Sequence, residues 1–259
     1  MSVRDPAWRY SRLTMSSVDG WLELVDAELF RTVDHVQRQR GVRGDLVDVG
    51  VYRGRSAVLL GLLADRDEQV IACDLFEDAV PYPGRPALFG ELRREQFERV
   101  WSQHVGRPVR VIQRLSTELA SLVPAGSCRV VHVDANHGYS YVLDDLRIAS
   151  TLVVPGGVVI ADDWRRADSP GVGAAFWRLV HEGTLIPALL SESKAYAVSV
   201  GGSDGVSALQ DAARGGLFRT EDHMIAGRTV VRVSAGAALR RWARLRVIGA
   251  ARRRLRRHR

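Results

Sequence analysis

Lysine is almost absent from this chain of 259 residues, because only Lys194 among its 37 Lys and Arg side chains is a lysine. A P-loop places a lysine directly after its last glycine, so a P-loop nucleotide site is excluded. Two cysteines, Cys73 and Cys128, are too few for a disulfide framework or a cysteine-only zinc site. No apolar run reaches the roughly 18 residues of a membrane-spanning helix, and no apolar signal segment is visible. We therefore expect a cytoplasmic protein.

Outside its C-terminal tail, the chain also lacks an excess of positive charge. The formal net charge is +7, but residues 240–259 contain ten arginines and no acid, so residues 1–239 carry a net charge of −3. We expect no nucleic-acid partner, because such a partner would need a basic face within the fold. The apolar residues near this end are spaced as in a helix, and a basic amphipathic helix can bind an anionic membrane at its inner face, or a partner. The alternative is a surface helix that Trp242 packs onto the body.

Apolar segments alternate with helical patterns along most of the chain. Strands are predicted at 45–50, 69–74, 108–113, 128–134 and 156–163, with two closing strands within 185–202. This alternation predicts a doubly wound, Rossmann-like α/β fold with a mostly parallel, seven-stranded sheet. An extra N-terminal helix is expected over 18–40 and a basic C-terminal helix from about 236. The predicted division is an N-terminal helical cap (1–43), a core (44–202) and a C-terminal extension with the arginine-rich tail (203–259).

The ends of the first two predicted strands indicate a nucleoside-containing cofactor. Gly50 and Gly54 flank a strand-to-helix turn, where backbone N–H groups and the helix N-terminus favour a close ligand. Asp74 ends the second strand, where a carboxylate can accept hydrogen bonds from ribose hydroxyls. Tyr52 stands where a dinucleotide-binding turn has its middle glycine, which argues against NAD or FAD. A cofactor with a ribose but no pyrophosphate fits better.

Four motifs in this order resemble class I S-adenosylmethionine-dependent methyltransferases over about residues 44–165: DVGVYRGRS (48–56), Asp74, VDANH (133–137) and PGGVVIADD (155–163). The resemblance implies that the Gly50–Gly54 turn holds the methionine part of the cofactor, that Asp74 holds the ribose and that Ser116 lies near the adenine. The cofactor-binding residues that it implies are Asp48, Gly50, Tyr52, Arg53, Gly54, Ser56, Asp74, Leu75, Ser116 and Asp134.

Three carboxylates follow the fourth and fifth strands of the core. Asp134, Asp162 and Asp163 would repel one another in one cleft, and a hard divalent cation relieves such repulsion. The arrangement is similar to metal-dependent O-methyltransferases of the catechol, caffeoyl-coenzyme A and macrolide-sugar types. That resemblance implies Mg²⁺ bound by these three residues. His137 stands where the catechol-type enzymes have a lysine base, so His137 and Asp134 are the candidate catalytic residues.

These motifs together predict an S-adenosylmethionine- and Mg²⁺-dependent O-methyltransferase. Its substrate would be a hydroxyl of a small molecule such as a sugar, a glycolipid or a secondary metabolite. Tyr139 and Trp164 would flank the acceptor, and the N-terminal helix and residues 78–90 are candidate lids. His132 is expected to be structural, and Asp145 to lie on a solvated helix face.

Two alternatives stay open at this point. One is a nucleotide-linked oxidoreductase, or a protein of a hydroxylation step, on the same fold. The other is a non-catalytic cofactor-binding adaptor that docks through its basic tail. The sequence leaves a homo-oligomer open.

Overall fold

A single mixed sheet forms the centre of the computed structural model, which describes residues 5–78 and 92–243. Its strand order is β3–β2–β1–β4–β5–β7–β6–β9–β8, and the first five of these strands are parallel. Their carboxyl ends meet at one edge, where ligands bind in open α/β sheets. The strands are Asp45–Val49 (β1), Val70–Cys73 (β2), Arg110–Ile112 (β3), Cys128–Val133 (β4), Val153–Ala161 (β5), Leu185–Leu190 (β6), Ala195–Ser199 (β7), Phe218–Ile225 (β8) and Arg228–Ala235 (β9).

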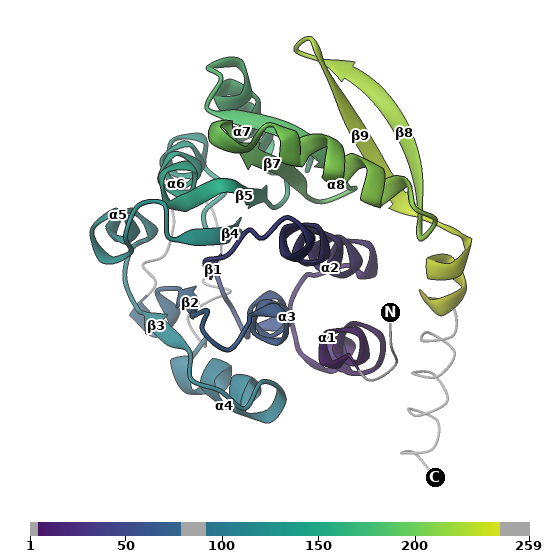
Figure 1. Ribbon diagram of the computed structural model, residues 1–259. Coiled ribbons are helices and arrows are strands. Elements are labelled where there is room, and N and C mark those ends of the chain that lie inside the picture. The colour runs from purple at the N-terminus through teal and green to yellow at the C-terminus, as the bar shows by residue number, and fades with distance from the viewer. Residues whose placement is uncertain (1–4, 79–91, 244–259) are drawn as a thin grey trace.

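Helices cover both faces of the sheet (Figure 1). On one face lie Leu24–Gln39 (α2), Arg55–Leu63 (α3), Arg94–His104 (α4) and Asp204–Arg214 (α8), and on the other Leu119–Leu122 (α5), Tyr139–Leu152 (α6) and Pro170–His181 (α7). Side chains alternate along the strands between these two cores: in β1, Leu46 joins the first, and Val47 and Val49 join the second. The doubly wound α/β prediction is therefore confirmed.

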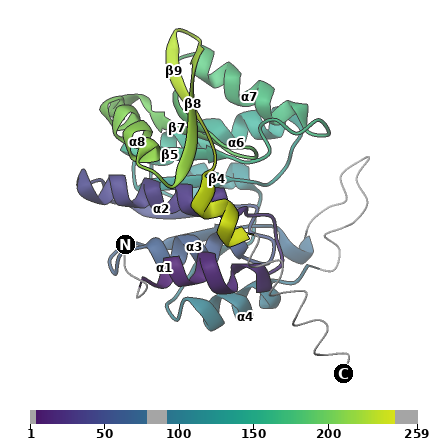
Figure 2. The same ribbon diagram turned by 90° about the vertical axis from the view of Figure 1, so that its right-hand side faces the viewer.

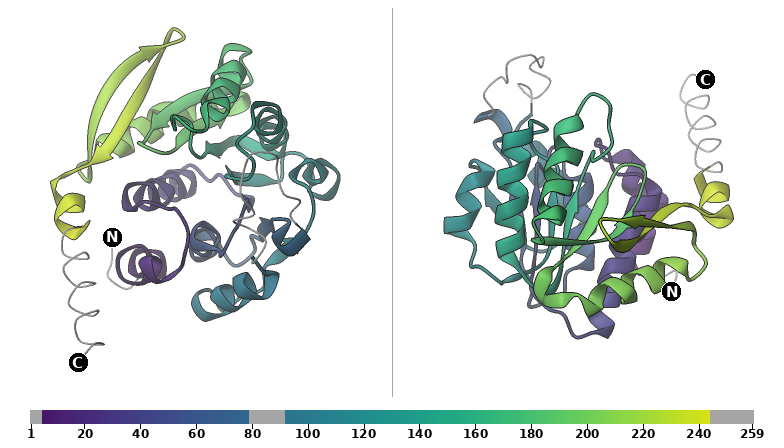
Figure 3. Two further views of the ribbon diagram at one scale, coloured as in Figure 1. Left: turned by 180° about the vertical axis from the view of Figure 1, so that it is seen from behind. Right: turned by 90° about the horizontal axis from the view of Figure 1, so that it is seen from above.

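The predicted count of seven mostly parallel strands is wrong. The sheet has nine strands, and β7 is antiparallel to both β5 and β6. The two additional strands, β8 and β9, form a hairpin beyond β6 that is visible in Figures 2 and 3. Its turn residues Ala226 and Gly227 both have positive φ, at 52° and 72°. The hairpin lacks the usual Asn-Gly or Asp-Gly signal, and most of β8 is not buried, so neither the turn nor the first strand has the usual sequence signature.

The N-terminal region differs from the expected single helix over 18–40. A short helix, Pro6–Arg9 (α1), continues into a π-helical turn at Tyr10–Thr14 and a 3₁₀ turn at Met15–Ser17, and α2 begins only at Leu24. The candidate lid at 78–90 falls, apart from Asp78, outside the described residues, as does the tail from 244 onward.

Trp242 near the start of the tail packs on this N-terminal region. Its ring meets that of Trp8 edge-on at a centroid distance of 6.1 Å, and the Arg12 guanidinium lies 5.7 Å from the Trp242 ring centroid. These contacts favour the packed surface helix over the membrane-bound one for the part of the tail that is described. Among residues 5–78 and 92–243, no helix combines the length and apolar composition that a membrane crossing requires.

Candidate active site

The turn between β1 and α3 brings the ends of β1 and β4 into contact. Gly50 has φ 85°, and a Cβ atom added there would lie 2.1 Å from the carbonyl oxygen of Asp134. Only glycine fits both the left-handed conformation and this close approach. Gly54, with φ 92°, donates to the carbonyl of Val51 at 2.9 Å and directly precedes α3. The first N–H groups of α3 therefore lie at the carboxyl edge of the sheet, where a helix favours polar or anionic ligands.

Asp74 holds this turn from the neighbouring strand. Its Oδ2 accepts a hydrogen bond from the backbone N–H of Tyr52 at 2.8 Å, and its Oδ1 accepts one from Phe76 at 2.9 Å. Burial raises the pKa of Asp74 more than these two N–H groups lower it. Each carboxylate oxygen has a second lone pair, so Asp74 can support the turn and still accept from a ligand hydroxyl.

Ser116 follows β3 and forms a hydrogen bond with Asp145 of α6. The prediction of a solvated Asp145 is wrong, because the residue is only 5% exposed and its Oδ2 has no hydrogen-bond partner. Burial raises the pKa of Asp145 to about 6, although Ser116 opposes the shift. An acidic residue on the inner face of an amphipathic helix breaks the usual pattern, which is why the sequence misplaces it.

The N-terminal region is attached to the β1–α3 turn. The Tyr10 hydroxyl donates to the carbonyl of Arg55 at 2.9 Å, and Arg55 Nε donates to the carbonyl of Val18 at 2.7 Å. The rings of Trp21 and Tyr52 lie 5.1 Å apart, and Trp21 is 69% exposed. An exposed aromatic side chain thus stands beside the predicted cofactor turn.

A line of buried polar groups runs from this turn to the end of β5. Ser56 Oγ donates to Asp48 Oδ2 at 2.7 Å, and Asp48 Oδ1 lies 2.6 Å from His132 Nδ1. On the other side of the imidazole, His132 Nε2 lies 3.2 Å from the Lys194 ammonium, which forms an ion pair with Asp162. Asp48 is fully buried, so any part it plays toward a cofactor is exerted through the groups it orients.

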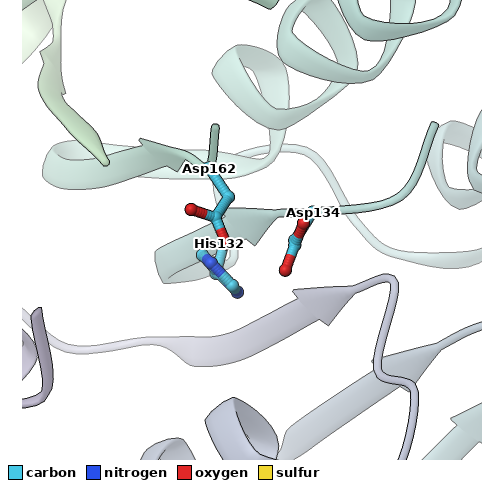
Figure 4. A group of neighbouring side chains, drawn as sticks. All are labelled: His132, Asp134 and Asp162. Atoms are coloured by element: carbon cyan, nitrogen blue, oxygen red, sulfur yellow. The ribbon is translucent and has the colours of Figure 1, made fainter. Parts of the chain in front are cut away.

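Asp134 joins two adjoining clusters at the ends of β4 and β5. The ligand atoms of His132, Asp134 and Asp162 lie within 4.8 Å of one another (Figure 4), and so do those of Asp134, His137 and Asp163. In the second cluster, His137 Nε2 is 3.3 Å from Asp163 Oδ2 and 3.6 Å from Asp134 Oδ1. The structure thus brings both candidate catalytic residues together.

Charges shift the pKa values within these clusters. Burial and the carboxylate of Asp162 raise the pKa of Asp134 to about 7. Burial disfavours the charged form of His137, but Asp134 and Asp163 outweigh it and raise the imidazole pKa to about 9. Burial would raise the pKa of Asp162 as well, yet Lys194 and His132 hold it below its usual value. Near neutral pH, His137 is therefore cationic, and Asp134 is poised to exchange a proton.

Sequence reasoning missed the groups that support these carboxylates. Lys194, directly before β7, and Asp26, on α2, are both buried, and so is His132 on β4. Asp26 accepts hydrogen bonds from the hydroxyls of Tyr196 at 2.7 Å and Ser193 at 2.9 Å. The one available signal was that a chain so rich in arginine uses a single lysine, next to the apolar strand of residues 195–199.

Comparisons with known proteins agree with this geometry. Residues 47–164 match the model of a family described as a methyltransferase domain. The structure of the O-methyltransferase NovP is similar, with a TM-score of 0.55 and 19% identity over 68% of this chain and 81% of that one. An O-methyltransferase from Bacillus cereus in complex with SAH has a TM-score of 0.51 and 13% identity over 76% of this chain and 91% of that one. The comparison with curated proteins finds no match.

Residues 47–164 are therefore a methyltransferase domain, and they contain the β1–α3 turn, Asp74 and the acidic clusters. The predicted resemblance is confirmed for this region, which matches a methyltransferase domain. The similarity to the solved structures at these identities supports the fold, and the matched domain supports the methyl-transfer chemistry.

The expected Mg²⁺ site does not fit the side chains as they lie. Asp162 Oδ2 is paired with the Lys194 ammonium, and its Oδ1 accepts the backbone N–H of Asp163 at 2.8 Å. Asp163 Oδ2 in turn faces His137 and the Arg166 guanidinium, whose Nη1 lies 3.2 Å away. Mg²⁺ demands near-octahedral oxygen coordination, whereas Asp162 and Asp163 already have cationic partners and belong to different clusters.

Proposed function

We propose that this methyltransferase is an O-methyltransferase acting on a hydroxyl of a small molecule. The observation that carries the proposal is the cluster of Asp134, His137 and Asp163 beside the predicted cofactor turn, whose Gly50 packs against the carbonyl of Asp134. A hydroxyl becomes a competent nucleophile only as it loses its proton, and this cluster can accept one. The printed names of the similar structures, both O-methyltransferases, are consistent with such an acceptor.

The cofactor supplies an electrophilic methyl group on a sulfonium. For cofactor binding we propose the turn residues Tyr52, Arg53 and Gly54, with Asp74 and the neighbouring Leu75 at the ribose and Ser116 near the adenine. The shape of the turn depends on Gly50, Asp48 and Ser56. The close approach of Gly50 to Asp134 and the hydrogen bond from Ser56 to Asp48 support this assignment. Asp134 spans both sites because its backbone touches Gly50 and its carboxylate belongs to the acidic clusters.

Asp134 and His137 have different roles in this proposal. Since the pKa of His137 is about 9 and that of Asp134 about 7, the imidazole is the cation of the pair near neutral pH. We assign proton acceptance from the acceptor hydroxyl to Asp134, and orientation and charge stabilisation to His137. Alignment of the two reactants supplies most of the remaining rate enhancement.

The acceptor is expected to enter between the N-terminal cap and the acidic clusters. The exposed ring of Trp21 lies on the cap beside Tyr52, and the rings of Tyr139 and Trp164 belong to segments that follow β4 and β5. Aromatic faces suit a sugar ring or a planar phenol. A sugar hydroxyl of a glycolipid or secondary metabolite remains our first candidate, with residues 1–43 as the cap, 44–202 as the core and 203–259 as the extension.

The test offers the enzyme a panel of sugars, glycolipids and phenols as acceptors. Methyl transfer is measured as the formation of S-adenosylhomocysteine. We expect turnover with at least one hydroxyl acceptor. Calorimetry with S-adenosylhomocysteine is run first, in buffer with and without Mg²⁺, because binding shows that the cofactor site is intact. Turnover only with an amine or thiol acceptor would contradict the proposed O-methylation.

A further inference from the structure

The single lysine of the chain lies under the candidate active site. Lys194 directly precedes β7 and has no exposed surface, although a buried ion loses several kcal/mol of hydration. Its ammonium lies between the carboxylate of Asp162 and Nε2 of His132. A buried cation at this cost is retained where its charge balances neighbouring acids.

The surroundings of Lys194 hold the ammonium in one place. Its backbone N–H donates to Ser191 Oγ at 2.8 Å, and its carbonyl accepts the N–H of Ser191 at 2.8 Å. This tight β6–β7 turn is fixed to the end of β5 by Trp164, whose Nε1 donates to the carbonyl of Ser191 at 3.2 Å and whose backbone N–H donates to Ser193. The ammonium is thus a fixed charge, as a bound ion would be.

Several acids face this charge from different elements. Asp162 follows β5, Asp134 follows β4, and Asp26 reaches in from α2. Burial raises the pKa of Asp26 and Asp134, and the charge of Lys194 opposes that rise. At Asp162 the same charge, together with His132, holds the pKa below its usual value although burial would raise it. A compact ammonium suits such a position better than the wide, planar guanidinium that this chain uses everywhere else. Nearby, His137 and Arg166 place positive charge against Asp163. These cationic side chains therefore offset part of the repulsion that predicted a divalent cation.

We propose that the Lys194 ammonium is the resident cation of this active site, taking the place that a divalent metal ion was expected to fill beside Asp134 and Asp162. The proposal deepens the proposed O-methylation and rests on it for the identity of the reaction. Methyl transfer then proceeds without added metal and in the presence of a chelator. Lys194 acts through Asp162 and His132, so it is a positioning residue.

Metal binding tests this proposal without any acceptor. Mn²⁺ is titrated into the full chain and followed by electron paramagnetic resonance and calorimetry, since Mn²⁺ prefers the same oxygen ligands as Mg²⁺. We expect no saturable binding by the wild type up to about 1 mM. Micromolar binding by the wild type that disappears in Asp162→Asn would overturn the proposal, whether or not an acceptor has been found.

Removal of the lysine should create the metal site. Lys194→Met keeps an unbranched side chain but leaves Asp134 and Asp162 without their cation. We expect this variant to bind Mn²⁺ about tenfold or more tightly than the wild type, and Mn²⁺ to raise its thermal midpoint. The matched control, Lys194→Met with Asp162→Asn, removes both charges and should bind no better than the wild type. Equal Mn²⁺ binding by all three proteins contradicts the proposal, and if Lys194→Met does not fold, the wild-type titration still decides.

A chelator separates this proposal from the proposed function. Once an acceptor is known, turnover by the wild type should be unchanged by EDTA and by later addition of Mg²⁺. Loss of turnover in EDTA with recovery in Mg²⁺ would contradict the role of Lys194 and leave O-methylation standing. Absence of turnover with every hydroxyl acceptor would contradict O-methylation and leave the Mn²⁺ result valid.

Discussion

Backbone groups shape one half of the sheet's carboxyl edge, and charged side chains shape the other. On the β1–β2–β3 side, glycine conformations and backbone N–H groups shape the turn, and one carboxylate, Asp74, holds it. On the β4–β5–β7 side, charged side chains such as Asp134, Asp162 and Lys194 make the site, and they balance one another. We expect the first half to determine cofactor affinity and the second to determine the rate of the chemical step. Substitutions that separate these two effects test the comparison.

The largest effect is expected in the second half. Asp134→Asn keeps the shape of the side chain but removes the proton acceptor, so kcat should fall about 10²–10⁴-fold. The affinity for S-adenosylhomocysteine, measured by calorimetry, should change little. Asp168→Asn serves as the control, because Asp168 is exposed and its carboxylate forms an ion pair with Arg166 at the surface. A kcat within about threefold of wild type in Asp134→Asn would remove Asp134 from the mechanism.

Gly50→Ala changes the contact between the ends of β1 and β4, where the two halves of the carboxyl edge meet. The new Cβ would lie 2.1 Å from the carbonyl oxygen of Asp134 at a left-handed φ, so the ends of β1 and β4 must separate. We expect a loss of about 3 kcal/mol or more in the free energy of unfolding, measured with urea, together with weaker cofactor binding. Gly126→Ala also has positive φ but no atom within 4 Å of the new Cβ, and should lose only about 1–2 kcal/mol. Equal losses in the two variants would show that the close approach is unimportant.

Asp74→Asn is the counterpart of Asp134→Asn on the cofactor side. The amide retains one acceptor oxygen, so either a turn N–H or a ribose hydroxyl loses its partner. We expect the Kd for S-adenosylhomocysteine to rise about tenfold, which corresponds to about 1.4 kcal/mol. At saturating cofactor, kcat should stay near the wild-type value. Asp78→Asn, at an exposed residue bonded to Gln113, is the control. A fall in kcat without a change in Kd would reverse the assignment of the two halves.

The same contrast explains how far the sequence predicts the structure. The elements of the parallel half, the Gly50–Gly54 turn and the carboxylate of Asp74 are local in sequence, and the structure places them as expected. Lys194 and Asp26 come from distant elements, and their roles arise only when β7 and α2 pack beside β5. The β8–β9 hairpin was not predicted for a different reason, since most of β8 is not buried and the Ala226-Gly227 turn lacks the usual hairpin residues.

The smallest expected effect is the pH dependence of stability that comes from Asp145, a buried residue on the cofactor side of the sheet edge. The folded-state pKa of about 6 lies above the value near 3.9 of an unfolded chain, so folding favours the protonated form. Stability from this group is complete below about pH 4 and is lost as the pH rises through 6. Between pH 5 and 7 the wild type should lose about 1 kcal/mol of unfolding free energy through this group, and Asp145→Asn should lose that much less.

Urea denaturation at the two pH values measures this difference, with Asp67→Asn, at an exposed residue of another segment, as the control. Asp145 hydrogen-bonds Ser116, the residue proposed to lie near the adenine, so bound S-adenosylhomocysteine should increase the pH dependence by excluding water from this region. Identical slopes in wild type and Asp145→Asn would mean that water reaches the carboxylate. The cofactor half would then be less enclosed than the half around Lys194.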